Sequence, residues 1–532
     1  MEFKQLFAKK PLQLLLDEMR GEHRLRRVLG PVQLTSLGIG CIIGTGIFVL
    51  VGKAAHDTSG PALMLSFVVA GLACIFAALC YAEFASIAPV AGSAYTYAYA
   101  TLGELFAWII GWDLVLEYTV ASATVSHGWS KYFQDFLKIF GVTLPEAIRT
   151  SPIEYKKVIE TVPETGLPTA VYRFFETGSV LDLPALMIAL LITAVLVKGI
   201  RESASFNAAM VITKVVIVIF VIVVGAFYIN PSNWTPFAPY GWTGISFFGW
   251  TVAGQSTAGG DPLGILAGAG IIFFAYIGFD SVSTHSEEAR NPQRDVPIGI
   301  IASLIICTIL YIAVAAVLTG MLPYTDINID APVSDAFGQK GLTWARFVIS
   351  LGAMTGITSV LLVLMLSQPR VLLAMARDGL LPNSFFGAVH ERFRTPWKST
   401  ILTGIVVAIM GALLPLGVLA DLTNIGTLLA FVIVCAAVLI LRKTHPDAER
   451  PFRVPFGPVF PVLGILTCLL LMFSLPPENW VRLGVWLGIG LLIYLGYGKS
   501  RSVMANYLRL EEARHGLSPG GHMVTQPDEP AR

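Results

Sequence analysis

The chain has 532 residues, of which 55% are hydrophobic and only 13% are charged, with a mean hydropathy of +0.70. Soluble domains carry about 25% charged residues, so this composition indicates a protein embedded in a lipid bilayer. The net charge of +1 at pH 7 argues against a nucleic-acid partner, because tracking a phosphate backbone requires a concentrated basic surface.

The first segment, residues 1–30, is basic and amphipathic. Its apolar stretch is too often interrupted by charges to act as a cleavable secretory signal. We therefore expect a cytoplasmic helix that lies on the membrane surface.

Apolar runs of about 20 residues predict membrane-spanning helices, and twelve can be placed. The expected fold class is thus an all-α integral membrane protein with twelve transmembrane helices. The predicted spans are residues 33–52, 60–88, 95–127, 182–199, 204–229, 263–284, 297–321, 344–374, 399–417, 420–441, 456–475 and 481–498.

The loop charges predict the orientation of the chain. The side shared with the N-terminus carries 25 of the 36 Lys and Arg residues, the other side carries 10, and Lys214 lies within a span. By the positive-inside rule, both termini are cytoplasmic. We expect a multi-pass protein of the plasma (inner) membrane that functions as a monomer.

Two long outside segments, residues 128–181 and 230–262, are expected to form extracellular caps. The tail after residue 510 has the polar composition of a disordered segment. All six cysteines fall inside apolar runs, so neither a disulfide framework nor a Cys/His metal site is expected.

The first span contains the stretch GIGCIIGTGIF, residues 38–48, with four glycines. One interpretation is a small-residue packing face made by Gly40, Gly44 and Gly46. The other is a break in the helix, which at membrane depth requires backbone groups that are buried in protein or line a wet cavity.

The sixth span favours the second interpretation, because it is also interrupted by a glycine, Gly278. Paired broken helices in corresponding positions of two halves indicate a transporter made of inverted repeats, with its substrate site at the midplane. A half-helix that restarts after a break presents N–H groups to an anion, and unwound carbonyls attract a cation. An α-amino acid carries both charges one carbon apart, so the predicted substrate is a small molecule of this kind, an L-amino acid.

Three stretches, GIGCIIGTGIF, FFAYIGFDSVSTHSEEARNPQRDVPIGI and QPRVLLAMARDGLLP, resemble segments of the amino acid, polyamine and organocation superfamily. Within it, they resemble bacterial-type members of the cationic amino acid transporter family. The resemblance runs from about residue 27 to about residue 500 and implies a five-plus-five inverted repeat of the LeuT type. The implied parts are a first repeat at 31–229, a second at 263–441, two added spans at 456–498 and a cytoplasmic tail at 499–532.

The resemblance also implies which backbone groups hold the charged ends of the substrate. The carboxylate is expected on the N–H groups of Gly44, Thr45 and Gly46. The α-ammonium is expected against the carbonyls of Ile42, Phe274, Ala275 and Ile277.

Several side chains near these positions have two interpretations. Phe279 is either a gate over the substrate or ordinary aromatic packing, and Asp280 is expected to stabilise the broken helix. Glu117 resembles an acidic position at the side-chain end of the family's pocket, where it could favour cationic substrates or hold a water network. Asp113 and Glu83 are expected to be structural hydrogen-bond partners.

Charges that follow the sixth and eighth spans either form an ion network at an inside gate or anchor the spans at the interface. These charges are Glu287, Glu288, Arg290, Arg294, Arg377 and Asp378.

Residues for catalysis are absent from the sequence. It contains no nucleotide-binding P-loop, and His127, His285 and His390 lack metal-ligand spacing, so we expect neither an enzyme nor a cofactor. Three classes remain: a secondary active amino acid transporter, which we favour, a channel or facilitator, and a nutrient sensor. Neutral or cationic substrates, uptake or exchange, and a polyamine-type alternative stay open.

Lys214 is the only charge in the fifth span, where an insertion scale assigns lysine a cost of roughly 2.5 to 3.5 kcal/mol. Its amine either extends to the interface or faces the bundle. In related transporters a sodium ion can lie between the first and eighth spans, and the resemblance implies that a lysine replaces it. The expected partners are the carbonyls of Gly40 and Ile43 and the hydroxyls of Thr358 and Ser359, and the expected activity is symport with protons.

Overall fold

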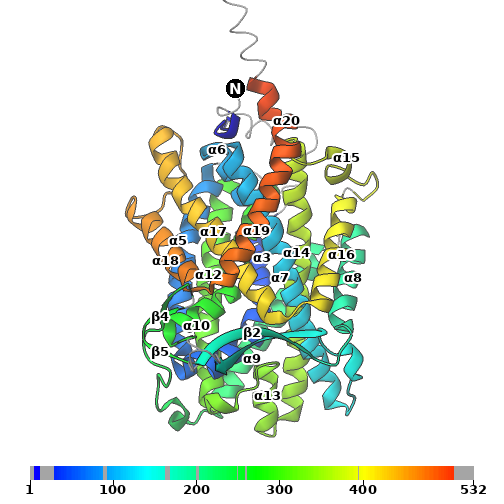
Figure 1. Ribbon diagram of the computed structural model, residues 1–532, viewed down its shortest axis with the longest axis vertical. Helices are drawn as coiled ribbons and strands as arrows, with labels where there is room; N and C mark the ends of the chain where they lie inside the picture. The colour runs from blue at the N-terminus through cyan, green and yellow to red at the C-terminus, as the bar shows by residue number, and fades with distance from the viewer. Residues whose placement is uncertain are drawn as a thin grey trace, which may run out of the picture.

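The computed structural model describes residues 5–11, 29–87, 93–161, 168–198, 203–248, 250–257, 261–393 and 395–508. Most of the predicted N-terminal surface helix, and the predicted disordered tail, lie outside these residues. Figure 1 shows an elongated bundle whose helices run along its long axis. Gln5 and Lys499 lie at the same end, where the Gln5 amide donates to the Lys499 carbonyl at 2.6 Å.

Within the described residues, eight helical stretches are long and apolar enough to cross a membrane, and four more apolar helices are shorter. The longer helices include α5 (Leu63–Ile87), α7 (Glu104–Ile139), α9 (Ser203–Ala226), α12 (Pro292–Met321), α14 (Thr343–Arg377), α17 (Leu416–Thr444) and α19 (Pro477–Ile493). The shorter four are α3 (Pro31–Ile42), α8 (Leu183–Lys198), α16 (Trp397–Leu413) and α18 (Val459–Ser474). The remaining short helices are α4 (Val51–Ala54), α6 (Ser93–Thr101), α10 (Ile265–Ile272), α11 (Ser281–Thr284), α13 (Pro332–Gln339), α15 (Asn383–Phe386) and α20 (Lys499–Arg501).

The described part of the chain is mostly helical rather than all-α, because its residues in the predicted caps form three two-stranded antiparallel sheets. The pairs are β1 (Ile153–Thr161) with β2 (Pro168–Glu176), β3 (Ile245–Phe247) with β4 (Trp250–Ala253), and β5 (Gln255–Ser256) with β6 (Pro262–Leu263). Hydropathy predicts membrane spans but does not detect such hairpins, which lie between the predicted spans.

The helices at the predicted third span, residues 95–127, differ from it at both ends: α6 (Ser93–Thr101) precedes the break, and α7 (Glu104–Ile139) extends beyond residue 127. Gly103 has a φ of +107°, a backbone conformation that favours glycine, and it separates α6 from α7. Helix α7 then continues to Ile139. The hydropathy signal ends earlier than the helix, because the last turns of α7 carry polar residues.

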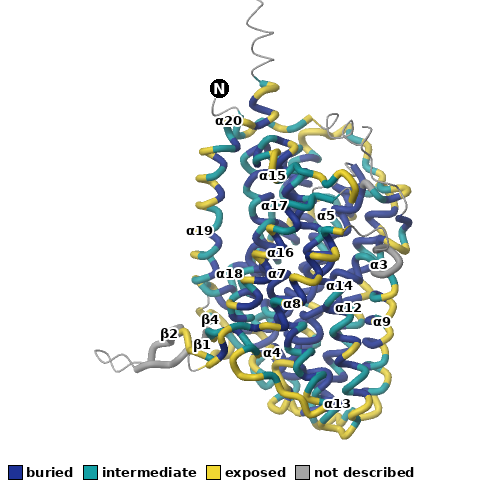
Figure 2. The backbone as a smooth tube through the Cα atoms, turned by 90° about the vertical axis from the view of Figure 1, so that its right-hand side faces the viewer, coloured by how far each residue is buried: buried dark blue, intermediate teal, exposed yellow. Residues whose placement is uncertain are grey.

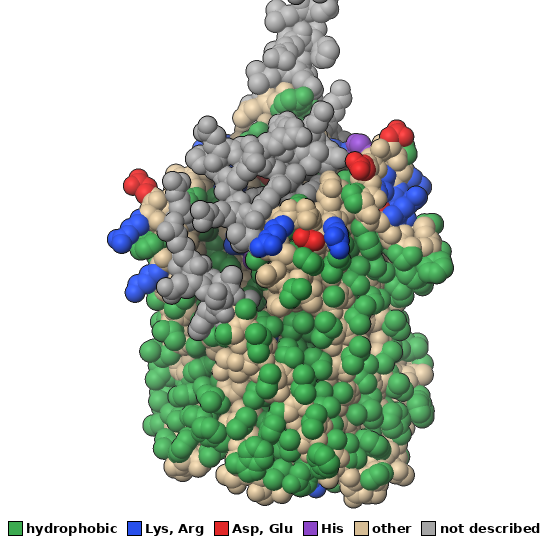
Figure 3. All heavy atoms as spheres, turned by 180° about the vertical axis from the view of Figure 1, so that it is seen from behind, with side chains coloured by type: hydrophobic (Ala, Val, Ile, Leu, Met, Phe, Trp, Pro, Cys, Tyr) green, Lys and Arg blue, Asp and Glu red, His purple; other side chains and the backbone are tan. Residues whose placement is uncertain are grey.

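Helix α7 is a central element that packs against α14 and α17, while α12 packs against both α3 and α5. Figure 2 shows buried residues through the interior of the bundle and exposed residues at its ends and on outer helices such as α19. On the face in Figure 3, hydrophobic side chains cover most of the length and charged side chains gather near one end. This surface is that of a multi-pass membrane protein.

Candidate substrate site

The first predicted break lies directly after α3. Ile43 has extended backbone angles (φ −73°, ψ 102°), and helical structure resumes at Gly46. The first N–H groups of a helix have no acceptor within it. Those between Gly44 and Gly46 are therefore suited to bind an anion.

The second predicted break follows α10. After one tight turn, η6 (Phe273–Tyr276), Ile277 is extended with a ψ of 135°. Gly278 has a φ of +115°, which an L side chain rarely adopts, and α11 begins at Ser281. The α-helical hydrogen-bond pattern ends at this turn, where the Phe274 carbonyl accepts from the N–H of Ile277 at 3.2 Å and the Ala275 carbonyl accepts from a side chain.

The two breaks contact each other. A Cβ atom at Gly278 would lie 2.5 Å from Sγ of Cys41, and one at Gly46 would overlap the backbone of Ala275. A glycine at each of these two positions therefore allows the interrupted helices to approach each other closely.

Tyr311 of α12 joins the two breaks, and the sequence analysis missed it. Its buried hydroxyl lies 2.7 Å from the carbonyl oxygen of Ile42 and 3.0 Å from that of Ala275, so both oxygens accept from one donor. The only signal in the sequence for this role is that a residue with a hydroxyl group, a tyrosine, lies within an apolar run. A buried tyrosine hydroxyl usually has such a partner.

A small cavity lies where the breaks meet. Of the residues predicted to contact substrate, Ala275, Phe279 and Glu117 do not line it. Thr45 Oγ1 is buried and has no hydrogen-bond partner among the described residues, so it is available to a ligand. The lining residues are Cys41, Ile42, Gly44, Thr45, Gly46, Ala121, Val125, Phe274, Ile277, Val360 and Leu364.

Phe279 lies in an aromatic cluster beside the cavity. Its ring centroid is 4.9 Å from that of Phe431 and 6.0 Å from that of Tyr81. These contacts are those of ordinary aromatic packing between helices.

Glu117 is buried in α7, near Asp280 and near Thr427 of α17. Asp280 accepts a hydrogen bond from Tyr118 at 2.9 Å. The carboxylates of Asp113 and Glu117 have no hydrogen-bond partner among the described residues. For Asp113, this differs from the predicted role as a structural hydrogen-bond partner.

The ammonium of Lys214 lies inside the bundle, and its side chain does not extend to the interface. It donates to the carbonyls of Gly40 and Ile43, the latter at 3.0 Å, and to the hydroxyl of Ser359 at 2.7 Å. Thr358 differs from the prediction, because its hydroxyl donates to Met354 one turn earlier. Lys214 thus connects α9, the first break and α14.

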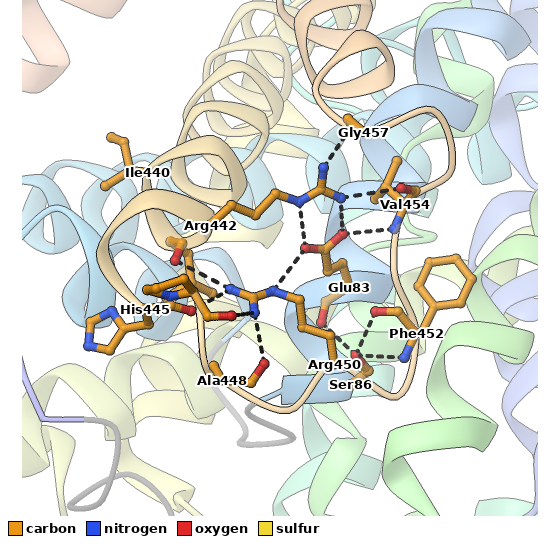
Figure 4. Close-up of polar contacts among 12 residues, drawn as sticks. Glu83, Ser86, Ile440, Arg442, His445, Ala448, Arg450, Phe452, Val454 and Gly457 are labelled. Atoms are coloured by element: carbon orange, nitrogen blue, oxygen red, sulfur yellow. Dashed lines mark hydrogen bonds and ion pairs between the residues drawn. The ribbon is translucent and has the colours of Figure 1, made fainter.

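Glu83 is held by two arginines, Arg442 and Arg450, as Figure 4 shows. Arg442 Nε donates to it at 2.9 Å, Arg450 Nε lies 3.6 Å away, and the backbone N–H of Val454 donates at 2.8 Å. This network ties the loop between α17 and α18 to the last turn of α5. Glu83 is therefore structural, as its sequence position predicts.

Among the described residues, Glu288 and Asp378 of the predicted inside-gate network form ion pairs, and each pairs with a residue outside the predicted set. Asp378 pairs with Lys10 at 2.8 Å and Glu288 with Arg370 at 3.0 Å. Burial is the largest single influence on the pKa of Glu288 and raises it, but Arg370 and His285 together outweigh burial, so the pKa is lowered. The side chain of Glu287 lies outside the described residues.

In the described part of the chain, no group of three or more His, Cys, Asp or Glu residues is arranged so that it could hold a metal ion. His127 instead faces Asp182, with 3.0 Å between Nδ1 and Oδ2.

The geometry can be compared with known proteins. The family model described as amino acid permease matches residues 29–493. The chain belongs to this family. The permease is 47% identical over 498 residues to the branched-chain amino acid permease BcaP of Bacillus subtilis, covering 93% of this chain and 98% of the relative.

Two other relatives differ in what their names say they carry. The methylthioribose transporter of Bacillus subtilis is 45% identical over 499 residues, covering 94% of this permease and 99% of the relative. The vacuolar cationic amino acid transporter 4 of Arabidopsis thaliana is 39% identical over 428 residues, covering 80% and 65%. The predicted superfamily is confirmed, and the family and these relatives are transporters, not enzymes.

Proposed function

We propose that this permease is a secondary active transporter that carries L-amino acids across the plasma membrane by alternating access. The observation that carries the proposal is the meeting of two helix breaks at one small cavity. Such breaks offer helix N–H groups and unwound carbonyls side by side, and an α-amino acid has the complementary carboxylate and ammonium.

In this proposal the substrate carboxylate binds the N–H groups of Gly44, Thr45 and Gly46, with the unpartnered Thr45 hydroxyl as a further donor. The ammonium binds carbonyls of the second break and the end of α3. The proposed carbonyls are those of Ile42, Phe274 and Ile277, which line the cavity, and that of Ala275, which lies beside it. Those of Ile42 and Ala275 also accept from Tyr311, which fixes their direction.

We further propose twelve spans in a five-plus-five repeat, and the helix packing supports it. If α3 with its continuation is span one, then α5, α7 and α8 are spans two to four, and α12, α14 and α16 are spans seven to nine. Each of the three packs against its counterpart five spans later: α5 on α12, α7 on α14 and α8 on α16. The contact of α9 with α14 likewise mirrors that of α17 with α7.

Both termini are cytoplasmic in this proposal. Gln5 and Lys499 meet at one end of the bundle, and on the face in Figure 3 charged side chains gather near that end. The positive-inside rule assigns such an end to the cytoplasm.

Lys214 is the proposed coupling residue, because its ammonium occupies a position bounded by three neutral oxygens. Removing an amine from water penalises its charged form, so proton gain and loss can follow the opening of the site to each side. A bound proton would then take the role of a sodium ion. Exchange and facilitated diffusion are the alternatives.

A second candidate function is transport of methylthioribose, favoured by the relative of that name. Methylthioribose lacks both charges of an amino acid. The test is binding by the purified permease in thermal-shift assays, since a ligand of the folded state raises its stability.

L-Amino acids should stabilise the permease, whereas analogues without the α-carboxylate or the α-amine should lose most of the effect. Equal binding of decarboxylated analogues such as cadaverine or agmatine would replace this proposal with the polyamine-type alternative. Stabilisation by methylthioribose alone would replace it with the second candidate.

A further inference from the structure

The cavity at the two breaks has a polar part and an apolar part. The polar part consists of the backbone groups described above and the Thr45 hydroxyl. The apolar part is formed by two helices that do not break: Ala121 and Val125 one turn apart on α7, and Val360 and Leu364 one turn apart on α14. Among the described residues, no charged side chain lines the cavity.

The nearest acidic residue on α7 does not enter this space. Glu117 lies one turn before Ala121, yet its carboxylate lies near Thr427 and Asp280. It is not a lining residue. The side-chain end of the cavity therefore provides no counter-charge for a guanidinium or an ammonium.

We propose that this apolar part takes the uncharged, apolar side chain of the substrate, such as that of leucine, isoleucine, valine or methionine. The inference rests on the proposed function, because it assumes that the breaks hold the α-amino and α-carboxylate groups. A cationic side chain would lose its hydration here without gaining a partner. An apolar one gains from burial, and each further methylene that fits tightens binding by about fourfold.

The size of the accepted side chain depends on both helices. Ala121 is the smallest of the four side chains, so a larger residue at this position directly reduces the space. Val360 lies against the first break, since a Cβ at Gly44 would be 2.6 Å from its Cγ2 atom. Ala121 and Val360 are thus specificity positions rather than residues that hold the substrate backbone.

The inference is tested by competition binding to the purified permease with leucine, valine, alanine, phenylalanine, arginine, lysine and methylthioribose. Leucine is expected to bind at least tenfold more tightly than arginine or lysine. Arginine or lysine binding as tightly as leucine would overturn the apolar subsite and leave the proposed amino acid transport standing. Binding of methylthioribose without any amino acid would overturn the proposed function itself.

Two variants locate the subsite. Ala121→Val should weaken leucine at least tenfold while alanine changes less than threefold, and Val360→Ala should increase the relative affinity for phenylalanine. The control is Ala209→Val, at an exposed position of α9. Equal effects of Ala121→Val on leucine and alanine, together with an unchanged order of affinities in Val360→Ala, would overturn the assignment of these positions.

Discussion

The ammonium nitrogen of Lys214 lies 3.0 Å from the carbonyl oxygen of Ile43, the residue at which the first helix is interrupted. A charge on the fifth predicted span is thereby in direct contact with the backbone that begins the proposed carboxylate site. Protonation of this amine and the geometry of the break are expected to depend on each other.

Substitution of Lys214 by alanine should abolish proton-driven accumulation of substrate. The measurement is uptake into proteoliposomes with an inward proton gradient, with and without sodium. The wild type should respond to protons and ignore sodium, and Lys214→Ala should do no more than equilibrate substrate. Lys340→Ala, at an exposed loop position, is the control. Sodium-dependent uptake, or a variant that still concentrates substrate, would contradict the coupling role.

Replacing Gly44 or Gly46, both in the first break, by a residue with a side chain should prevent substrate binding. Gly44→Leu adds a side chain whose Cβ would lie 2.6 Å from Val360, and Gly46→Ala overlaps the backbone of Ala275. Thermal-shift titrations should show at least a hundredfold loss of affinity in both variants. Gly488→Ala is the matched control, because a Cβ there has no atom within 4 Å. A folded Gly44→Leu variant with wild-type affinity would refute the site.

Tyr311→Phe should weaken the connection between the breaks. The substitution removes one hydroxyl that two buried carbonyls share, a loss of about 1 kcal/mol in the free energy of unfolding. We expect a lower melting temperature of the purified protein and weaker substrate binding together. Tyr228→Phe, at an exposed tyrosine, controls for loss of a hydroxyl. Loss of stability with unchanged substrate affinity would limit Tyr311 to a structural role.

Glu83→Gln should destabilise the protein where the loop between α17 and α18 meets α5. Removing the carboxylate leaves Arg442 and Arg450 partly buried without their counter-charge, and breaking such a pair costs about 3 to 5 kcal/mol. The control is Glu146→Gln, which breaks an exposed pair with Arg149 and should cost less than about 1 kcal/mol. Melting temperatures in detergent give the comparison, and equal effects of the two substitutions would contradict the prediction.

The contribution of Glu288 to stability should depend on pH. Burial, the largest single influence, raises its pKa, but Arg370 and His285 together outweigh burial and the pKa is lowered. A carboxyl with a lowered folded-state pKa stabilises the protein above its unfolded-state pKa, and this stabilisation is lost as pH falls through the folded-state value. The melting temperature of the wild type should therefore exceed that of Glu288→Gln at pH 7, and the difference should shrink below about pH 4. A difference that grows on acidification would contradict the assignment.

Local sequence signals predicted the elements that depend on local chemistry. Gly278, with its positive φ, and the extended residue before Gly44 lie at the interruptions that the glycine pattern predicts. The helix boundaries near the predicted third span differ from the prediction, since hydropathy alone does not detect the backbone turn at Gly103. Tyr311 was missed because nothing in an apolar run shows which distant carbonyls a hydroxyl will meet.

The sequence by itself determined that this chain lies in a membrane and that one lysine, Lys214, lies within an apolar span, and it predicted that two helices are interrupted. Each of these follows from composition or from short patterns, because the bilayer penalises charge and unpaired backbone wherever they occur. Only the tertiary structure decided that Gly46 meets Ala275, that Glu117 lies outside the cavity and that Val360 of α14 lines it. These relationships join residues far apart in the chain, and they depend on how helices cross, which no local pattern encodes.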